Sequence, residues 1–253
     1  MVNNNMKTNV RSGMKLPLNV TPTYTCELPS TKKQVKYRPF LVREEKILLI
    51  ALETEDDKTI QDAVVQVIQN CVLNKDIDVS ILPIFDFEYL FLKVRGKAVG
   101  EVVNLKLKCP DDEKELVDVP LDLDKVQVKY DDKHKSNIEF EKGYGVVMRY
   151  PTIGSFTNKS TTTDLTFGLV ATCIESIYKG EEVFDRNNIE QGELDEWVNS
   201  LTQDQFTKMG EFFATMPKIT HTLKYKNPKS GKEFEMKLSG IKDFFQLPST
   251  TTA

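Results

Sequence analysis

The sequence is poor in the residues on which catalysis, disulfide pairing and membrane insertion depend. It holds two histidines, four cysteines and one tryptophan among 253 residues. Its longest aliphatic run, residues 47–52, is far shorter than the roughly 20 residues of a membrane-spanning helix. The cysteines lie far apart and form no C-x-x-C pair, which disfavours a disulfide scaffold and a cysteine metal site. We therefore expect a protein of a reducing cytoplasm that does not contact a membrane.

Charge is distributed unevenly along a chain whose formal net charge is −4. Residues 1–38 hold seven basic residues against one acid, and residues 205–253 hold eight lysines against four acids. Between them, residues 181–204 hold eight acids against Arg186. Such asymmetry suits docking to charged protein partners. Nucleic-acid binding by the basic end segments is the alternative, which the intervening acidic block weakens.

Helical periodicity dominates the first hundred residues. The pattern of residues 41–52 predicts a helix, and we expect the charged side chains of its first turn to be exposed to solvent. A second helix carries an apolar stripe at i, i+3, i+4 and i+7 spacing from Ile60 to Cys71, with a cap candidate at Asp56. Residues 84–94 are apolar almost all round, which favours a helix buried on several sides, although a central strand would read similarly.

The apolar period then changes to two, which predicts an antiparallel β meander in the middle of the chain. Acidic or glycine-containing turns separate the expected strands. The strands lie near residues 103–109, 126–130, 138–140 and 146–150.

Helical spacing returns over residues 170–178, and we expect this helix to end at Gly180. A short helix over residues 194–201 precedes one that opens with a capping box of Thr202 and Gln205. The buried stripe of that last helix is expected to contain Phe206, Met209, Phe213 and Met216.

A β-hairpin around residues 227–231 and a short closing helix with Phe244 and Phe245 complete the expected elements. The fold class that follows is α+β, with helices around one sheet. We expect a single domain over residues 16–246, within which residues 187–246 could form a C-terminal subdomain. Residues 1–15 and 247–253 have little to bury and are expected to be disordered ends.

Few side chains are candidates for chemistry. His134 lies in the charged segment DDKHKSN, which indicates a solvated residue, and His221 opens the expected hairpin, which favours a structural role. Asp86 and Glu88 stand in an apolar helix, where a carboxyl with a raised pKa could act as a general acid. Two residues apart they diverge, so ion pairs with basic neighbours such as Lys93 are the better interpretation.

Several spaced motifs resemble one narrow family. The segment VTPTYTCELPSTKKQVKYRPFLVREEKILLIALET, residues 20–54, is similar to the N-terminal block of the baseplate hub proteins of T4-like bacteriophages. The likeness continues through Asn70 and Cys71, the segment LPIFDFEYLFLKVR at residues 82–95, and FFATMPKITHTLKY…LSGIKDFF at residues 212–245. It covers most of residues 16–246, the middle strands being least diagnostic.

The resemblance implies a late viral protein, made in the cytoplasm of the infected bacterium, that binds other hub or wedge proteins while the central hub of a contractile-tail baseplate is built. It implies no catalysis, no cofactor, no metal and no small-molecule substrate. Whether such a protein stays in the virion tail or acts as an assembly factor is left open, and the assembly role is favoured because no fibrous or repeated segment is present. The alternatives are the nucleic-acid-binding module and, less favoured, a hydrolase using His221 or Asp86.

The charged residues of the RPFLVREEK motif are the predicted partner contacts: Arg38, Arg43, Glu44 and Glu45. We expect them on the outside of the protein, where substitution would have little effect on folding. The sequence of the hairpin turn predicts that a metal site has been lost. In related phage proteins it can read C-x-x-C-G, as in a zinc knuckle, whereas here Asn227 and Ser230 stand at the ligand positions and are poor substitutes for thiolates.

Overall fold

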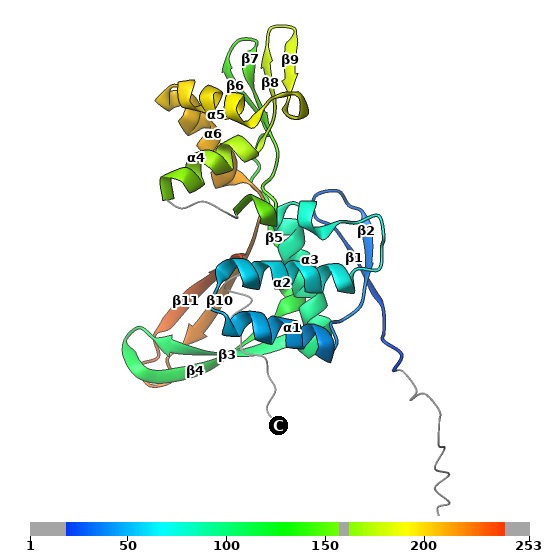
Figure 1. Ribbon diagram of the computed structural model, residues 1–253. Coiled ribbons are helices and arrows are strands. Elements are labelled where there is room, and N and C mark those ends of the chain that lie inside the picture. Colours follow the sequence, from blue (N-terminus) through cyan, green and yellow to red (C-terminus); the bar gives the residue numbers. More distant parts are fainter. Residues whose placement is uncertain (1–18, 157–161, 241–253) are drawn as a thin grey trace, which may run out of the picture.

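A computed structural model describes residues 19–156 and 162–240 and shows a lower body and an upper lobe (Figure 1). The body contains α1 (Val42–Glu53), α2 (Asp57–Cys71), α3 (Ile84–Val99), the short helices η1 (Val79–Ile81) and η2 (Leu123–Lys125), and the strands β1 (Tyr24–Glu27), β2 (Gln34–Tyr37), β3 (Val102–Cys109), β4 (Asp112–Asp122), β5 (Val128–Lys129), β10 (Lys218–Lys226) and β11 (Glu233–Ser239). The upper lobe contains β6 (Asn137–Glu141), β7 (Tyr144–Met148), β8 (Ile174–Lys179), β9 (Glu182–Asp185), η4 (Arg186–Asn188), α4 (Thr162–Thr172), α5 (Gln191–Ser200) and α6 (Gln203–Thr215), and η3 (Ile153–Phe156) lies between the two parts.

The helices expected in the first hundred residues are confirmed. Helix α2 is capped by Asp56, whose side chain accepts a hydrogen bond from the backbone of Thr59, and its apolar stripe is buried from Ala63 to Cys71. Helix α3 is buried on several sides, as its composition predicts. In the upper lobe the capping box of α6 is also confirmed, since Thr202 and Gln205 exchange side-chain-to-backbone hydrogen bonds of 2.9 and 3.3 Å.

The α+β class is confirmed, but the prediction of one sheet with a single meander is wrong. Among the described residues the strands form separate antiparallel sheets, in the orders β1-β2, β3-β4, β11-β10-β5 and β6-β7-β8-β9. The short strand β5 leaves the expected meander because Val128 and Lys129 pair with Ile219 and Lys218 at the start of the C-terminal hairpin. Alternation of apolar residues predicts strands, but it does not determine which strands pair.

The predicted helix over residues 170–178 is also wrong in its second half. Helix α4 ends at Thr172, and residues 174–179 form β8, which pairs with β7 and β9. Residues 170, 173, 174 and 177 fit a helical stripe, but β-branched residues such as Ile174 and Ile177 also suit a strand, and a register shift between Ile174 and Ser176 lets both be buried although they are three residues apart. Gly180, expected to end the helix, instead has φ +64° in the β8–β9 turn.

Two hydrophobic cores occupy the two parts of the molecule. The body core joins α2 and α3 to β1–β4 and also takes Ile219, Leu223 and Leu238 from the C-terminal hairpin. The core of the upper lobe joins β6–β8 to α4, α5 and α6. The helices of the segment 187–246 therefore pack in one core and its hairpin in the other. The extent of the single domain, residues 16–246, stays a prediction.

The remaining expectations concern the chain ends, the cysteines and the membrane. Residues 1–15, residues 247–253 and the helix with Phe244 and Phe245 lie outside the described residues. All four cysteines are buried and free of disulfides. Within residues 19–156 and 162–240, no helix combines the length and the apolar character needed to cross a membrane.

Candidate functional site

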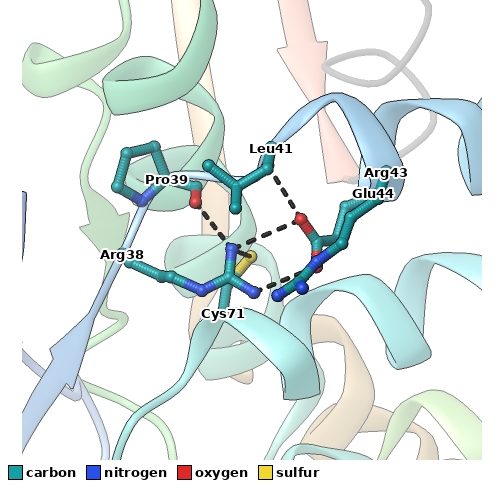
Figure 2. Close-up of polar contacts among 6 residues, drawn as sticks. All are labelled: Arg38, Pro39, Leu41, Arg43, Glu44 and Cys71. Carbon is teal, nitrogen blue, oxygen red and sulfur yellow. Dashed lines mark hydrogen bonds and ion pairs between the residues drawn. The ribbon is translucent and has the colours of Figure 1, made fainter. Parts of the chain in front are cut away.

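The first turn of α1 holds a buried charge cluster, so the expectation that its charged side chains all face solvent is wrong. Arg38 is 9% exposed and Glu44 only 1%. The chain leaves β2 through Arg38 and Pro39, both buried, and α1 then begins at Val42 with Glu44 pointing toward α2 (Figure 2). Glu44 and Ala51, seven residues apart, form the inner face of the helix.

Glu44 is held by donors on three sides (Figure 2). The guanidinium of Arg38 donates to both carboxylate oxygens, at 2.9 and 3.3 Å, and Nε of Arg43 donates to Oε1 at 2.7 Å. The backbone N–H of Leu41 donates to Oε2 at 2.8 Å, so Glu44 also caps the otherwise unsatisfied start of α1. The pair is thus both an ion pair and a helix cap.

The electrostatics of the cluster favour the charged carboxylate. Burial acts to raise the pKa of Glu44, but the hydrogen bonds from Arg38, Arg43 and the Leu41 N–H prevail and lower the pKa to about 2. Next to it, burial raises the pKa of the Cys71 thiol to about 11. At neutral pH the cluster therefore contains an ionised carboxylate and a protonated thiol, which suits structural support more than acid–base chemistry.

Arg38 connects three elements. Its side chain donates to the carbonyl of Pro39 at 3.0 Å, and its backbone N–H donates to the carbonyl of Cys71 at 2.9 Å. Leu73 donates in turn to the carbonyl of Lys36 at 2.8 Å, which continues the ladder between β2 and the segment after α2. The cluster therefore fixes α1 and the end of α2 against β2.

The other two predicted contact residues lie differently. The side chain of Arg43 is 70% exposed although it reaches Glu44, and Glu45 is half-buried. Exposed apolar residues share their side of the helix: Val42 is 80% exposed and Leu49 is 55% exposed. Successive helical residues are turned by about 100°, so Val42, Lys46 and Leu49 point away from the buried Glu44 and Ala51. Helix α1 thus has an outward face that the described residues leave uncovered.

The histidines are not brought together with a common partner. The expectation that His134 is solvated is wrong: it is half-buried between Tyr150 and Phe212, with ring centroids 5.5 and 5.0 Å away, and its Nδ1 lies 3.0 Å from Oγ1 of Thr215. Burial lowers the pKa of His134. Burial also lowers the pKa of His221, which is half-buried on β10 opposite Leu238.

Asp86 does not make the expected ion pair. Its carboxylate accepts a hydrogen bond of 2.9 Å from the backbone N–H of Ser30 and a second from the Ser30 hydroxyl. Burial raises the pKa of Asp86, while those two hydrogen bonds act to lower it. Lys93, the expected partner, instead pairs with Asp124 at 2.7 Å. Asp86 therefore anchors the β1–β2 turn to the first turn of α3.

The hairpin turn at residues 227–231 is filled by hydrogen bonds among its own residues and with the β3–β4 turn. Asn227 is 1% exposed, and its amide donates to Asp111 at 2.8 Å while its carbonyl accepts from the backbone of Lys229 and Ser230. The Ser230 hydroxyl donates to the same Asp111 carboxylate at 2.5 Å. Because these polar atoms satisfy one another, the residues present do not fit a zinc ion. We name Asp111, Asn227 and Ser230 the turn clasp.

One pocket groups residues that sequence reasoning did not connect. It has a volume of about 540 Å³ and lies between β1 and α3. From α3 it takes Tyr89, Lys93 and Lys97, and from η2 it takes Asp124. Tyr89, Lys93 and Lys97 are four residues apart, so the sequence alone indicates that they share one face of a helix. Only the fold shows that Asp124 and β1 lie beside this face.

These observations define an α+β protein whose polar clusters fasten turns and helix ends to one another. The sequence matches the model of one family, described as T4 bacteriophage base plate protein, over residues 21–246. The chain belongs to this family. The resemblance of its motifs to T4-like baseplate proteins is therefore confirmed. No curated protein and no solved structure matches the chain.

Proposed function

We propose that this baseplate-family protein acts without catalysis by binding other baseplate proteins during assembly of the central hub of a contractile tail. The observation that carries the proposal is the family match over residues 21–246, which covers both parts of the described fold. The buried charge cluster and the turn clasp support a role without catalysis, since their polar side chains hydrogen-bond one another and join structural elements. We favour an assembly role in the cytoplasm of the infected host over a permanent place in the virion.

The outward face of α1 is the surface that we propose for this contact. It is defined by Val42, Arg43, Glu45, Lys46 and Leu49, on the side opposite the buried Glu44. Apolar side chains with charged neighbours are typical of a protein interface, in which the rim charges select the partner. We no longer propose Arg38 and Glu44 as direct partner contacts. Both side chains are buried, so we assign them to the support of this helix.

The proposal is tested by removing the protein from infected cells and then by altering the face. Loss of the protein is expected to give baseplates without hubs, and normal hubs in its absence would refute the proposal. In the intact protein, Leu49→Asp should abolish co-purification with hub or wedge proteins without lowering thermal stability. Val183→Asp, at an apolar residue of β9 that is 67% exposed, is the matched control and should leave co-purification unchanged. Peptide mapping of virions and of assembly intermediates then separates subunit from assembly factor.

Ion pairing among the C-terminal lysines favours a protein partner over the nucleic-acid alternative. Lys224 pairs with Glu235 at 3.0 Å, and Lys229 pairs with Glu115 at 2.5 Å and with Asp112 at 3.7 Å. Such pairs interrupt a basic surface that would follow a phosphate backbone. Retention of DNA or RNA by the purified protein, with an affinity that falls steeply with salt, would reverse this preference.

A further inference from the structure

We infer that the turn clasp and its neighbours are arranged as a four-ligand metal site in which hydrogen bonds stand in place of the ion. The four positions, which we name the knuckle positions, are residues 109 and 112 of the β3–β4 turn and residues 227 and 230 of the β10–β11 turn. The inference concerns how the two hairpins are joined, so it does not depend on the proposed function.

The two turns share one sequence pattern. Residues 109–112 read CPDD and residues 227–230 read NPKS, so each turn offers two polar or thiol side chains three positions apart, with a proline after the first. Proline presets the backbone for a tight turn. Gly231, with φ +72°, completes the second turn in a conformation that other residues adopt at a cost. Two such pairs on two hairpins are the ligand arrangement of zinc ribbons, in which the ligands are thiolates.

The fold brings the tips of the two hairpins together (Figure 1). Alternate residues of β3 are buried as far as Cys109, which is 0% exposed, and the buried face of β10 continues to Asn227, which is 1% exposed. Cys109 and Asp112 are partners across their turn, so their side chains share one face of the ribbon. The Tyr225 hydroxyl donates to the carbonyl of Lys108 at 3.1 Å and closes the two ribbons beside the tips. The knuckle positions therefore lie at one junction.

Backbone donors are aimed at knuckle positions 112, 227 and 230. The side-chain carbonyl of Asn227 accepts from the N–H groups of Lys229 and Ser230 at 2.8 and 3.2 Å. The Ser230 hydroxyl and the Asp112 carboxylate each accept from the N–H two residues further along, at 3.3 and 3.1 Å. At metal sites, hydrogen bonds of this kind orient the ligand side chains, and they favour a thiolate over a thiol. The backbone is therefore already set for ligands at these positions.

The centre of the junction holds an anion where a metal site would hold a cation. Asp111 accepts from the Ser230 hydroxyl at 2.5 Å and from the Asn227 amide at 2.8 Å, and these two bonds lower the pKa of its carboxyl. A hydroxyl and an amide donate to a carboxylate, whereas thiolates repel it and need a cation. The side chains around the centre thus decide its sign. With Asn227 and Ser230 in place, closure by the Asp111 carboxylate is favoured over closure by zinc.

Rebuilding the ligand set tests the inference. The full chain with Asp111→Ala, Asp112→Cys, Asn227→Cys and Ser230→Cys, together with the native Cys109, should bind a single Co²⁺ ion and show the visible absorption of tetrahedral thiolate coordination. Zn²⁺ should displace the Co²⁺ and raise the melting temperature. The same variant with Cys109→Ser is the matched control and should bind Co²⁺ at least about tenfold more weakly. Equal binding by the two proteins, or no thiolate absorption from the folded variant, would overturn the inference.

A single substitution tests the same convergence in a nearly native chain, which also covers the case in which the fourfold variant does not fold. Asn227→Cys and Ser230→Cys are made separately and treated with diamide, which takes up the two hydrogens of a thiol pair. At least one of them should form a disulfide with Cys109, because thiols that can share one metal ion lie within bonding reach. Thr222→Cys, at an exposed position of β10, is the control and should not pair with Cys109. If peptide mapping without reduction finds neither disulfide, the positions do not converge and the inference is wrong.

The native protein provides the remaining measurement. Chelation with EDTA should leave its melting temperature unchanged and should lower the melting temperature of the zinc-loaded fourfold variant. Native protein that contains stoichiometric zinc and is destabilised by the chelator would overturn the inference, because a metal ion and not Asp111 would then close the junction.

Discussion

The body and its junction with the upper lobe each withdraw one ionisable side chain from solvent. These two side chains are held in opposite charge states, one ionised and one neutral. In the body, Glu44 is buried as an anion because three donors converge on it. At the junction, His134 is half-buried among aromatic rings, and this burial lowers its pKa, which favours the neutral imidazole. The difference shows that burial alone does not set the charge. The number of compensating hydrogen bonds decides whether desolvation prevails.

Removal of Glu44 should have the largest effect on stability. Glu44→Ala leaves the Arg38 guanidinium buried without its partner and uncaps α1, so we expect a loss of about 3–5 kcal/mol in the free energy of unfolding. Glu45→Ala, at the half-buried neighbouring position, should cost less than about 0.5 kcal/mol. Urea unfolding of both variants measures the contrast, and similar losses would show that the ion pair has no special weight.

A double variant sharpens the same comparison. Arg38→Met combined with Glu44→Leu removes both charges and fills the space with apolar atoms. Replacement of a whole buried pair is often neutral, so the double variant should be more stable than Glu44→Ala alone. If it is not more stable than Glu44→Ala, the unpaired Arg38 guanidinium carries little cost, and the cap to Leu41, which both variants lose, accounts for the loss.

Acid should act on the body through Glu44. The pKa of this carboxyl is lowered from 4.5 to about 2 in the folded protein, so its stabilising contribution is present above pH 4.5 and is lost as the pH falls through 2. The contribution is on the order of 3 kcal/mol. Urea unfolding of wild type and Glu44→Gln from pH 6 to pH 2 should converge at the acid end, and parallel curves would contradict the assignment.

The turn clasp should follow with a smaller effect. Asn227→Ala removes three side-chain hydrogen bonds and leaves Asp111 and two backbone N–H groups short of a partner. We expect a loss of about 1–3 kcal/mol. Lys226→Ala, at the exposed neighbouring position, is the control and should change stability by less than about 0.5 kcal/mol. Addition of zinc should not restore Asn227→Ala, because no ligand set is completed.

Local signals in the sequence were sufficient for some elements and not for others. The stripe of α2 and the capping box of α6 each involve residues of a single helix, so spacing alone predicted them. The inward position of Glu44 was also readable, since it precedes Ile47, Leu48 and Ala51 by three, four and seven residues. Its charge led to the opposite expectation.

Other features depend on contacts between distant residues. His134 meets Thr215 across 81 positions, and Asp111 meets Asn227 across 116. Nothing in the segments DDKHKSN or NPKSG reveals those partners. The same holds for β5, which the sequence assigned to a meander and the fold pairs with β10. Strand existence is a local property, whereas strand partnership is decided by the packing of the whole chain.

The smallest effect is expected at His134, on the other side of the comparison. Because burial lowers its pKa below 6.5, the folded protein binds fewer protons than the unfolded chain, and the contribution of the neutral ring is present above pH 6.5 and is lost as the pH falls through the folded pKa. His134→Phe keeps an aromatic ring against Tyr150 and Phe212 but cannot be protonated. Wild type should therefore lose stability between pH 7 and pH 5 relative to His134→Phe, as measured by urea unfolding. The lowered pKa of His221 is common to both proteins and cancels in the difference, whereas the charge of Asp131 acts to raise the pKa of His134 and is part of the effect measured. A difference that stays constant across this range would show that His134 does not couple the junction to pH.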